Sequence, residues 1–410
     1  MAEWSQLPVE LLDLISKRLS SEIDLLRFRS VCSAWRSSVP PPSSPSGFPI
    51  LPNDGFSSTT WGFNLSRRII YYIGLPQSHY QTSRITNKNG WIVKLERDKT
   101  DRMHLLNPLT MCQFKPFPEN FPKMFDFWNL QISELASEYT LQSINYRPLA
   151  SSIGDASNLY MEKVAFCFKD DGFFILLTIH VSGKLVMYKS GDTKWTTIND
   201  FPSPYDDVIF YEGNFYAVDN TGRTVSVIFD SEMIPSVSLV AGPVYGGDKK
   251  FFVKSCRDLL LVDKYLSVGP EDDLGYTEGL EFYEEFDCFM SERTVKFKVF
   301  RLDRSGEMWV EMNNLDDRIL FLGDNCTFSA SASDFNFGGK GNCIFFTDQF
   351  FPNREEEVEW KNRGIGVFHL ETGSIGPMSS YHGYTEMFWP PPVWIYPTTA
   401  LEDGLRQLHI

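Results

Sequence analysis

The sequence predicts a small all-α segment of two to three helices followed by a large all-β domain, which we expect to be a degenerate β-propeller of six to eight blades. Apolar residues recur at helical spacing only near the N-terminus, a proline-rich stretch follows, and the remainder alternates short apolar runs with turn residues. We therefore divide the chain into a helical module (1–39), a Pro/Ser-rich linker (40–54), a β-domain (55–396) and a tail (397–410). A pair of β-sandwiches with long loops is the alternative for the β-domain.

The first expected helix starts near Pro8, which suits a first turn because its missing N–H costs nothing there. Ser21 and Asp24 offer a break and a loose capping box for a second helix. One apolar stripe follows each start: Leu11, Leu12, Ile15 and Leu19, then Leu25, Phe28, Cys32 and Trp35. A module this short cannot bury all of these apolar side chains by itself. The remaining ones therefore pack on the rest of the chain or on another protein. Periodicity alone favours packing on the rest of the chain over packing on another protein by roughly two to one.

The segment LPVELLDLISKRLSSEIDLLRFRSVCSAWRSSV, residues 7–39, closely resembles the F-box, the helical module that docks on the Skp adaptor of SCF ubiquitin ligases. The resemblance rests on Leu7-Pro8, Glu10-Leu11-Leu12, Ile15, Leu19, Asp24-Leu25, Arg29-Ser30-Val31-Cys32 and Trp35-Arg36. It implies a Skp-family adaptor as partner and, through it, cullin and RING subunits. The residues expected to bind the adaptor are Leu7, Pro8, Leu11, Leu12, Ile15, Leu19, Leu25, Val31 and Trp35.

The linker is expected to be stiff and extended. Residues 40–52 contain six prolines, which cannot continue a helix and lack the amide donors that a sheet needs. A proline-rich spacer of this kind holds two modules at a set distance better than a flexible one.

Residues 55–396 contain no convincing long helix. Turn residues such as Asp171-Gly172 and Ser190-Gly191 separate the expected strands. These strands are Ile69–Ile73, Trp91–Leu95, Val164–Phe168, Phe173–Ile179, Leu185–Tyr188, Val208–Tyr211, Asn214–Val218, Thr224–Phe229, Leu259–Val262, Val295–Leu302, Arg318–Leu322, Cys343–Thr347 and Gly366–Leu370.

An imperfect internal repeat favours the propeller. In each copy a strand ends seven residues before a tryptophan, an apolar strand follows, and then a glycine-led strand ends in an acid. The copies contain Tyr188, Trp195 and Gly213–Asp219, and Leu302, Trp309 and Gly341–Asp348. At ~40–50 residues for each four-stranded blade, the 342 residues of the β-domain predict six to eight blades.

The β-domain also resembles the plant F-box-associated domain called domain of unknown function 295, of kelch-like propeller type. The resemblance is carried by Leu105–Thr110, Val299–Asp303, Trp309–Glu311, Phe321–Asn325, Ile344–Asp348 and Pro391–Trp394, and it is poor at 117–160 and 271–287. It implies a propeller-like domain that binds a partner and is not an enzyme. We expect Trp389–Trp394 to form the last strand, whose tryptophans anchor ring closure.

No motif predicts catalysis, a metal or a cofactor. The six histidines show no metal-ligand spacing, and no GxSxG nucleophile elbow occurs. The run Gly338-Gly339-Lys340-Gly341 lacks the register of a phosphate loop. Residues 271–287 carry eight acids and no Lys or Arg, which indicates either a loop for a basic partner or a solvated insertion; the second is favoured by about three to one.

Charge and cysteine usage limit the classes of partner. The chain has 410 residues, 38 Lys and Arg and 53 Asp and Glu, and its net charge of −15 disfavours nucleic acid. The longest strongly apolar run, Phe173 to Val181, is far shorter than the ~20 residues of a membrane span. The N-terminus lacks a signal-peptide pattern, and seven scattered cysteines without a CxxC pair indicate an intracellular protein of the nucleus or cytoplasm.

The hypothesis that accounts for most of these features is a substrate-recognition subunit of an SCF-type ubiquitin ligase. The helical module would bind the Skp adaptor, and the β-domain would hold an unknown target protein for ubiquitination. The alternatives are an F-box scaffold or regulatory binder that acts without cullin and a propeller enzyme of unknown chemistry.

Overall fold

The structure of the chain is a computed structural model. It describes residues 4–19, 21–39, 50–52, 62–75, 90–97, 102–110, 112–114, 117, 119–122, 130–144, 163–168, 172–180, 182–198, 204–230, 233–270, 290–305, 307–335, 341–348, 364–381 and 383–395. Most of the predicted linker, the acidic segment 271–287, residues 338–340 and the predicted tail lie outside the described residues.

Three short α-helices form the N-terminal module, as predicted: α1 (Val9–Ser16), α2 (Glu22–Ser30) and α3 (Ser33–Ser38). A 3-10 turn, η1 (Trp4–Gln6), precedes them. The Ser16 hydroxyl donates to the Asp13 carbonyl oxygen at 2.8 Å in the last turn of α1. Ser21 has extended backbone at the N-terminus of α2, but its side chain makes no capping hydrogen bond. The predicted capping box is therefore not formed, although the predicted helix start is.

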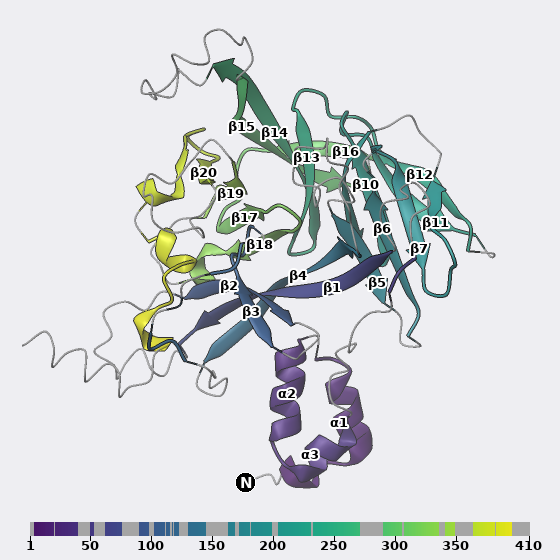
Figure 1. The fold of residues 1–410 in the computed structure, drawn as a ribbon, viewed down its shortest axis with the longest axis vertical. Coiled ribbons are helices and arrows are strands. Elements are labelled where there is room, and N and C mark those ends of the chain that lie inside the picture. Colours follow the sequence, from purple (N-terminus) through teal and green to yellow (C-terminus); the bar gives the residue numbers. More distant parts are fainter. Residues whose placement is uncertain are drawn as a thin grey trace, which may run out of the picture.

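The described part of the β-domain forms five sheets arranged around an axis (Figure 1). The first contains β1 (Phe63–Gly74), β2 (Trp91–Arg97), β3 (Met103–Leu106) and β4 (Gln131–Ser143). The second contains β5 (Val164–Phe168), β6 (Phe174–Ile179), β7 (Leu185–Lys189) and β8 (Thr196–Ile198). The third contains β9 (Tyr205–Tyr211), β10 (Asn214–Asp219), β11 (Thr224–Phe229) and β12 (Pro235–Ala241). The fourth contains β13 (Lys249–Ser255), β14 (Asp258–Pro270), β15 (Met290–Asp303) and β16 (Met308–Met312). The fifth contains β17 (Arg318–Leu322), β18 (Thr327–Ser331), β19 (Cys343–Thr347), β20 (Ile365–His369) and β21 (Ile375–Pro377).

Each sheet is one blade of a propeller. The strands β4, β5, β9, β13 and β18 each lie at one end of their sheet and contact one another in this cyclic order, which closes the ring. The propeller prediction is confirmed, but the predicted six to eight blades are wrong because the described residues form five. The estimate assumed blades of uniform length, whereas β1, β4, β14 and β15 are 12 to 14 residues long.

Thirteen of the fourteen predicted strands lie on observed strands, the closing strand Trp389–Trp394 being the exception, and eight observed strands were not predicted. The largest omission is β4, whose residues include Glu134, Leu135 and Ala136, types that favour helices. Antiparallel pairing with β1 along its whole length overrides that preference. The other unpredicted strands are β3, β8, β12, β13, β16, β18 and β21.

The internal repeat holds for its first two elements and then shifts by one strand. Tyr188 and Leu302 lie on the third strand of their blades, β7 and β15. The following strands are not equivalent, because β9 is innermost in the third blade whereas β17 is second in the fifth. There β18 folds back into the inner position, and β19 pairs with β17 in parallel.

The C-terminal segment covers the first blade instead of adding a strand to the ring. The last described strand is β21, and a 3-10 turn, η9 (Val393–Ile395), stands where the closing strand was expected. Trp389 stacks on Phe114 with ring centroids 4.6 Å apart, and Trp394 belongs to the same buried cluster. The predicted strand is therefore wrong, because these tryptophans pack on a finished sheet rather than pairing with its edge.

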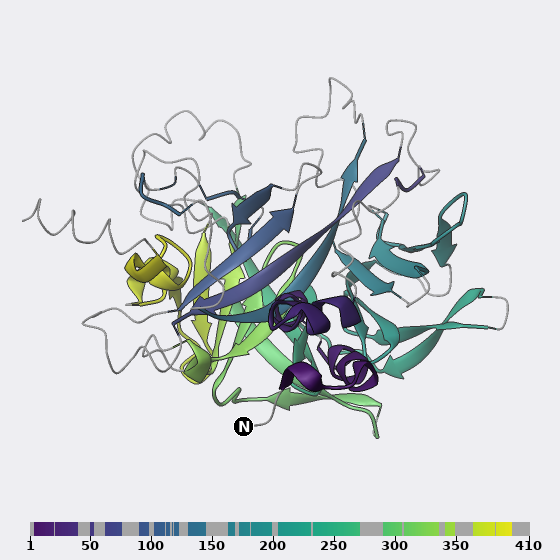
Figure 2. The ribbon, with the colours of Figure 1, turned by 90° about the horizontal axis from the view of Figure 1, so that it is seen from below.

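The helical module projects from the propeller beside β1, β3 and β4 (Figure 1). Seen from below, the helices lie across that face of the ring (Figure 2). In the part of the chain that the structure describes, no helix is long and apolar enough to cross a membrane.

Candidate functional site

The helical module has a small hydrophobic core of its own. Leu12, Phe28 and Val39 are its buried members. Four partly buried side chains surround them: Leu7, Leu19, Leu25 and Trp35. The Phe28 and Trp35 rings lie 4.5 Å apart, and the Trp35 indole N–H donates to the Trp4 carbonyl oxygen at 2.9 Å. This core fixes α3 against α2 and leaves the opposite side of α1 free.

The free side of α1 is apolar. Leu11, Leu14 and Ile15 are exposed, and their i, i+3 and i+4 spacing places them on one face of the helix. Val31 after α2 is also exposed, by 52% of its surface. So many exposed large apolar residues on a module of this size indicate a surface that another protein covers. We call Leu11, Leu14 and Ile15 the apolar face.

The nine residues predicted to bind an adaptor divide into three groups. Pro8, Leu11, Ile15 and Val31 are exposed, so their side chains are available to a partner. Leu7, Leu19, Leu25 and Trp35 are partly buried and pack on the core of the module. Leu12 is only 1% exposed, which removes it as a direct contact and makes it part of the core that shapes the face.

Leu14 was not among the predicted contacts, although it is 58% exposed on the apolar face. Its position three residues after Leu11 could have identified it. Trp4, Val9 and Leu26 are also exposed large apolar residues of the module. Sequence periodicity did not separate these residues from Leu12, because a short helix with apolar residues on most sides has no single stripe.

The second helix joins the module to the propeller. Ile23 is buried in the same cluster as Ile69 and Tyr71 of β1. The Arg27 guanidinium donates to the Leu130 carbonyl oxygen at 2.9 Å, just before β4. Burial raises the pKa of the Tyr71 phenol, and the Glu134 and Glu22 carboxylates raise it further. Both apolar and polar contacts therefore fix α2 against the first blade.

The end of the predicted linker is part of the propeller. Leu51 and Phe63 exchange two backbone hydrogen bonds of 2.9 Å as an isolated bridge beside β1. The Trp195 indole N–H donates to the Pro52 carbonyl oxygen at 2.9 Å. The chain that leaves the helical module is thus attached to the first and second blades.

The axis of the propeller contains a cavity of about 740 Å³. Side chains of all five innermost strands line it, and Ser21 and Asp24 of the helical module also reach it. The Lys163 ammonium, from the residue before β5, binds Asp207 of β9 at 2.8 Å and Thr327 of β18 at 3.0 Å. Because β5 and β18 are not neighbours in the ring, Lys163 links the inner strands of two non-adjacent blades.

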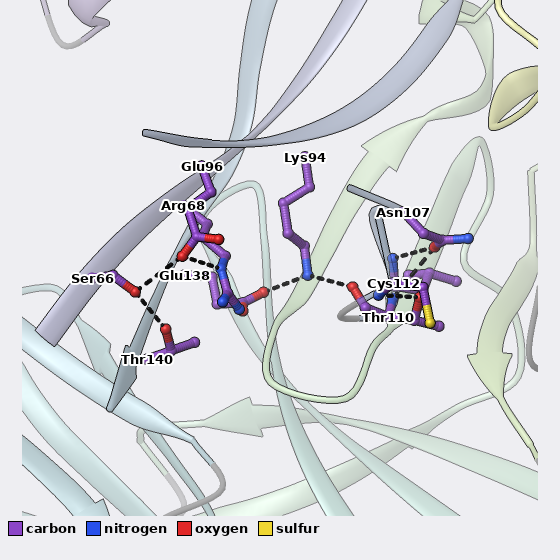
Figure 3. Close-up of polar contacts among 10 residues, drawn as sticks. Ser66, Arg68, Lys94, Glu96, Asn107, Thr110, Cys112, Glu138 and Thr140 are labelled. Carbon is purple, nitrogen blue, oxygen red and sulfur yellow. Dashed lines mark hydrogen bonds and ion pairs between the residues drawn. The ribbon is translucent and has the colours of Figure 1, made fainter. Parts of the chain in front are cut away.

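A buried polar cluster supports the wall of this cavity in the first blade (Figure 3). The Glu138 carboxylate of β4 lies 3.0 Å from the Arg68 guanidinium and 2.6 Å from the Lys94 ammonium. Lys94 also donates to the Thr110 carbonyl oxygen at 3.2 Å, and Asn107 accepts the N–H groups of Leu109 and Thr110. The cluster therefore ties three strands to the loop that follows β3.

None of these groups forms a recognisable catalytic or metal centre. In the described ranges no group of three or more His, Cys, Asp or Glu side chains is placed to hold a metal ion. The cavity lining within those ranges contains no histidine, and its carboxylates face cationic partners.

The helical module and the propeller each match a family model. The model described as F-box domain matches residues 4–43, and the model described as KIB1-4 beta-propeller matches residues 62–369. An apolar helical module carried by a five-bladed ring is therefore an F-box joined to a propeller, the architecture of an F-box protein. The chain belongs to the family of F-box proteins with a KIB1-4 β-propeller.

Relatives in Arabidopsis thaliana share the whole architecture. The chain is 44% identical to the protein named F-box protein SKIP23, over 99% of each chain. It is 36% identical to F-box protein At2g17036, over 98% of this chain and 96% of that one. A solved structure of a Synechocystis apocarotenoid oxygenase matches over 80% of this chain and 79% of that one, with 10% identity. Its TM-score of 0.25 is too low to indicate a shared fold. The resemblance to domain of unknown function 295 and to the kelch type stays a prediction.

Proposed function

We propose that this F-box protein is the substrate-recognition subunit of an SCF-type ubiquitin ligase in the nucleus or cytoplasm. The helical module binds a Skp-family adaptor and, through it, cullin and RING subunits, while the propeller binds a target protein. The chain carries out no chemistry itself, because holding the target close to the conjugating machinery raises the local concentration of its lysines. The observation that carries the proposal is the exposed apolar face, which the propeller leaves uncovered.

The direct contacts are the exposed members of the predicted set, Pro8, Leu11, Ile15 and Val31, together with Leu14. Complete burial of one leucine or isoleucine side chain against a partner contributes ~1.5–3 kcal/mol. Several such side chains on one face are enough to support a stable complex. Leu7, Leu12, Leu19, Leu25 and Trp35 act indirectly by holding α1 in place.

The contacts between the helical module and the propeller support a receptor in which the two parts keep a fixed relative orientation. Ile23, Arg27 and the bridge between Leu51 and Phe63 attach the helices and the linker to the first blade. A target on the propeller would then sit at a defined distance from the adaptor. Such a fixed distance favours transfer to a limited set of target lysines.

The test is adaptor binding by a surface variant that keeps the core of the module. Leu11→Ser with Ile15→Ser removes two apolar contacts, and we expect its affinity for a purified Skp adaptor to fall at least tenfold in calorimetry. Leu239→Ser with Ile228→Ser is the matched control, since these exposed residues lie on the third blade. Unchanged adaptor binding by the first variant, with wild-type helicity, would refute the proposal.

Two alternative functions, a scaffold without cullin and a propeller enzyme, can be distinguished from the proposed one by further measurements. An F-box scaffold that acts without cullin would bind the adaptor normally but would not co-purify cullin. A propeller enzyme requires an axial pocket with converging polar groups, and the axial cavity meets the first half of that requirement. The carboxylates among the described lining residues lie in ion pairs with arginines and do not form an acid–base pair, so binding is the better supported use.

A further inference from the structure

The axial cavity has the size of a small-ligand site. Its volume of about 740 Å³ lies within the ~300–1,000 Å³ that is typical of ligand pockets. Lys163 bridges the inner strands β5 and β18, and Asp24 of the helical module reaches the lining. An extended polypeptide would have to displace these groups to thread the ring, so the space suits a compact molecule.

The acidic groups of the lining are already paired. Asp24 lies 3.3 Å from the Arg27 guanidinium, and Glu134 lies 3.4 Å from that of Arg67. Glu138 is held between Arg68 and Lys94 in the buried cluster of Figure 3. These carboxylates therefore do not neutralise a further cation in the cavity.

The basic groups of the lining are not all paired. Lys163 is neutralised by Asp207, but Lys254 and Arg318 form no ion pair with any residue that the structure describes. Asp317 and Glu212 interact electrostatically with Arg318 and Lys254, but Asp317 accepts hydrogen bonds from Ser331 and Ser333, and Glu212 binds Arg304 at 2.7 Å. Two cations without a direct ion pair among the described residues thus line a cavity in a chain whose net charge is −15.

The Ser329 hydroxyl links the Arg318 side chain to the backbone of Lys254. The Arg318 guanidinium donates to the Ser329 hydroxyl oxygen at 2.6 Å, and that hydroxyl donates to the Lys254 carbonyl oxygen at 3.0 Å. This hydrogen bond orients the Arg318 guanidinium. Its Nε is buried and has no hydrogen-bond partner among the described residues. A planar guanidinium with open donors matches the two oxygens of a phosphate or carboxylate group.

We propose that the axial cavity binds a small organic anion, whose phosphate or carboxylate group contacts Arg318 and Lys254. The ligand fills the space enclosed by the five inner strands and touches the start of α2 at Ser21 and Asp24. The site is independent of the apolar face, so adaptor binding and ligand binding can fail separately.

The test is calorimetric titration of the full chain with pyrophosphate and, separately, with citrate at low ionic strength. We expect at least one probe to bind, and the stronger of the two identifies whether phosphate or carboxylate is preferred. Arg318→Gln and Lys254→Gln each remove one charge and should weaken that probe at least tenfold. Arg318→Lys keeps the charge but loses the planar fork, so it should restore only part of the affinity.

Lys194→Gln is the matched control, because Lys194 is an exposed lysine in the turn before β8 and does not line the cavity. It changes the net charge by the same amount and should leave probe binding unchanged. Thermal unfolding confirms that each variant is folded. Absence of binding by both probes, or equal weakening by Lys194→Gln and Arg318→Gln, overturns the proposal.

Discussion

Gly323 packs directly on the backbone of Leu109. A Cβ atom at Gly323 would lie 2.6 Å from the Leu109 carbonyl oxygen, and the neighbouring Asp324 N–H donates to that same oxygen at 2.8 Å. Leu109 follows β3 of the first blade, whereas Gly323 follows β17 of the fifth. The contact joins the two ends of the ring. It also gives a physical reason for two motifs that carry the family resemblance, Leu105–Thr110 and Phe321–Asn325.

Gly323→Ala should destabilise the propeller. The added methyl group would overlap a carbonyl oxygen that already accepts a hydrogen bond, so the blades must move apart, at a cost of about 1–3 kcal/mol. Urea unfolding followed by tryptophan fluorescence measures the change. Gly242→Ala is the control, since a Cβ there meets no atom within 4 Å. Equal stabilities of the two variants would contradict this account of ring closure.

Leu12→Ala and Leu11→Ala should separate stability from binding. Leu12 is buried in the core of the helical module, so its truncation should cost about 2–5 kcal/mol in the free energy of unfolding of that module. Leu11 is 46% exposed, and its truncation should change stability by less than about 1 kcal/mol. Far-ultraviolet circular dichroism and limited proteolysis of the helices report the difference. A stable Leu12→Ala module would show that the core is assigned incorrectly.

Glu138→Gln should destabilise the first blade strongly. The substitution removes the negative charge that faces Arg68 and Lys94, and both cations are buried. An uncompensated buried charge costs about 3–5 kcal/mol, and Gln keeps nearly the same shape. Thermal unfolding measures the loss. Glu311→Gln, which breaks an exposed pair with Lys298, is the control and should cost less than about 1 kcal/mol.

The stability of the propeller should depend on Asp206 between about pH 4 and pH 6. Burial raises the pKa of the Asp206 carboxyl to about 6 from its ordinary 3.8, although the Lys250 N–H and the charges of Lys249 and Lys250 oppose the shift. The folded chain therefore holds a proton that the unfolded chain has released, so rising pH removes stability across this window. The contribution is present below about pH 4 and lost above about pH 6.

Asp206→Asn removes this titration. At neutral pH the variant should be more stable than the wild type by about 1–2 kcal/mol, and near pH 4 the difference should vanish. Urea unfolding at several pH values tests the expectation. The exposed Asp258→Asn is the control. A variant that is less stable than the wild type at neutral pH would show that the ionised Asp206 carboxylate stabilises the fold.

The local sequence was sufficient to predict a strand wherever a segment is strongly periodic. The strands around Leu176, Val225 and Phe345 read as apolar runs between turn residues, and these three residues are fully buried in central strands of their blades. Segments with mixed polarity could not be assigned in this way. In β12 exposed, partly buried and buried residues are mixed, and in β4 residue types that favour helices form a strand that pairs with β1.

The candidate sites also combine features that the local sequence predicts with features that only the tertiary structure reveals. The sequence alone determined that a helical F-box precedes a β-propeller, because helical and strand periodicity and the F-box residues are local properties of the chain. Only the tertiary structure decided the five blades, the burial of Leu12 beside the exposure of Leu11, and the placement of Lys254 and Arg318 on the wall of the axial cavity. These features depend on contacts between residues far apart in the chain, which no local pattern encodes.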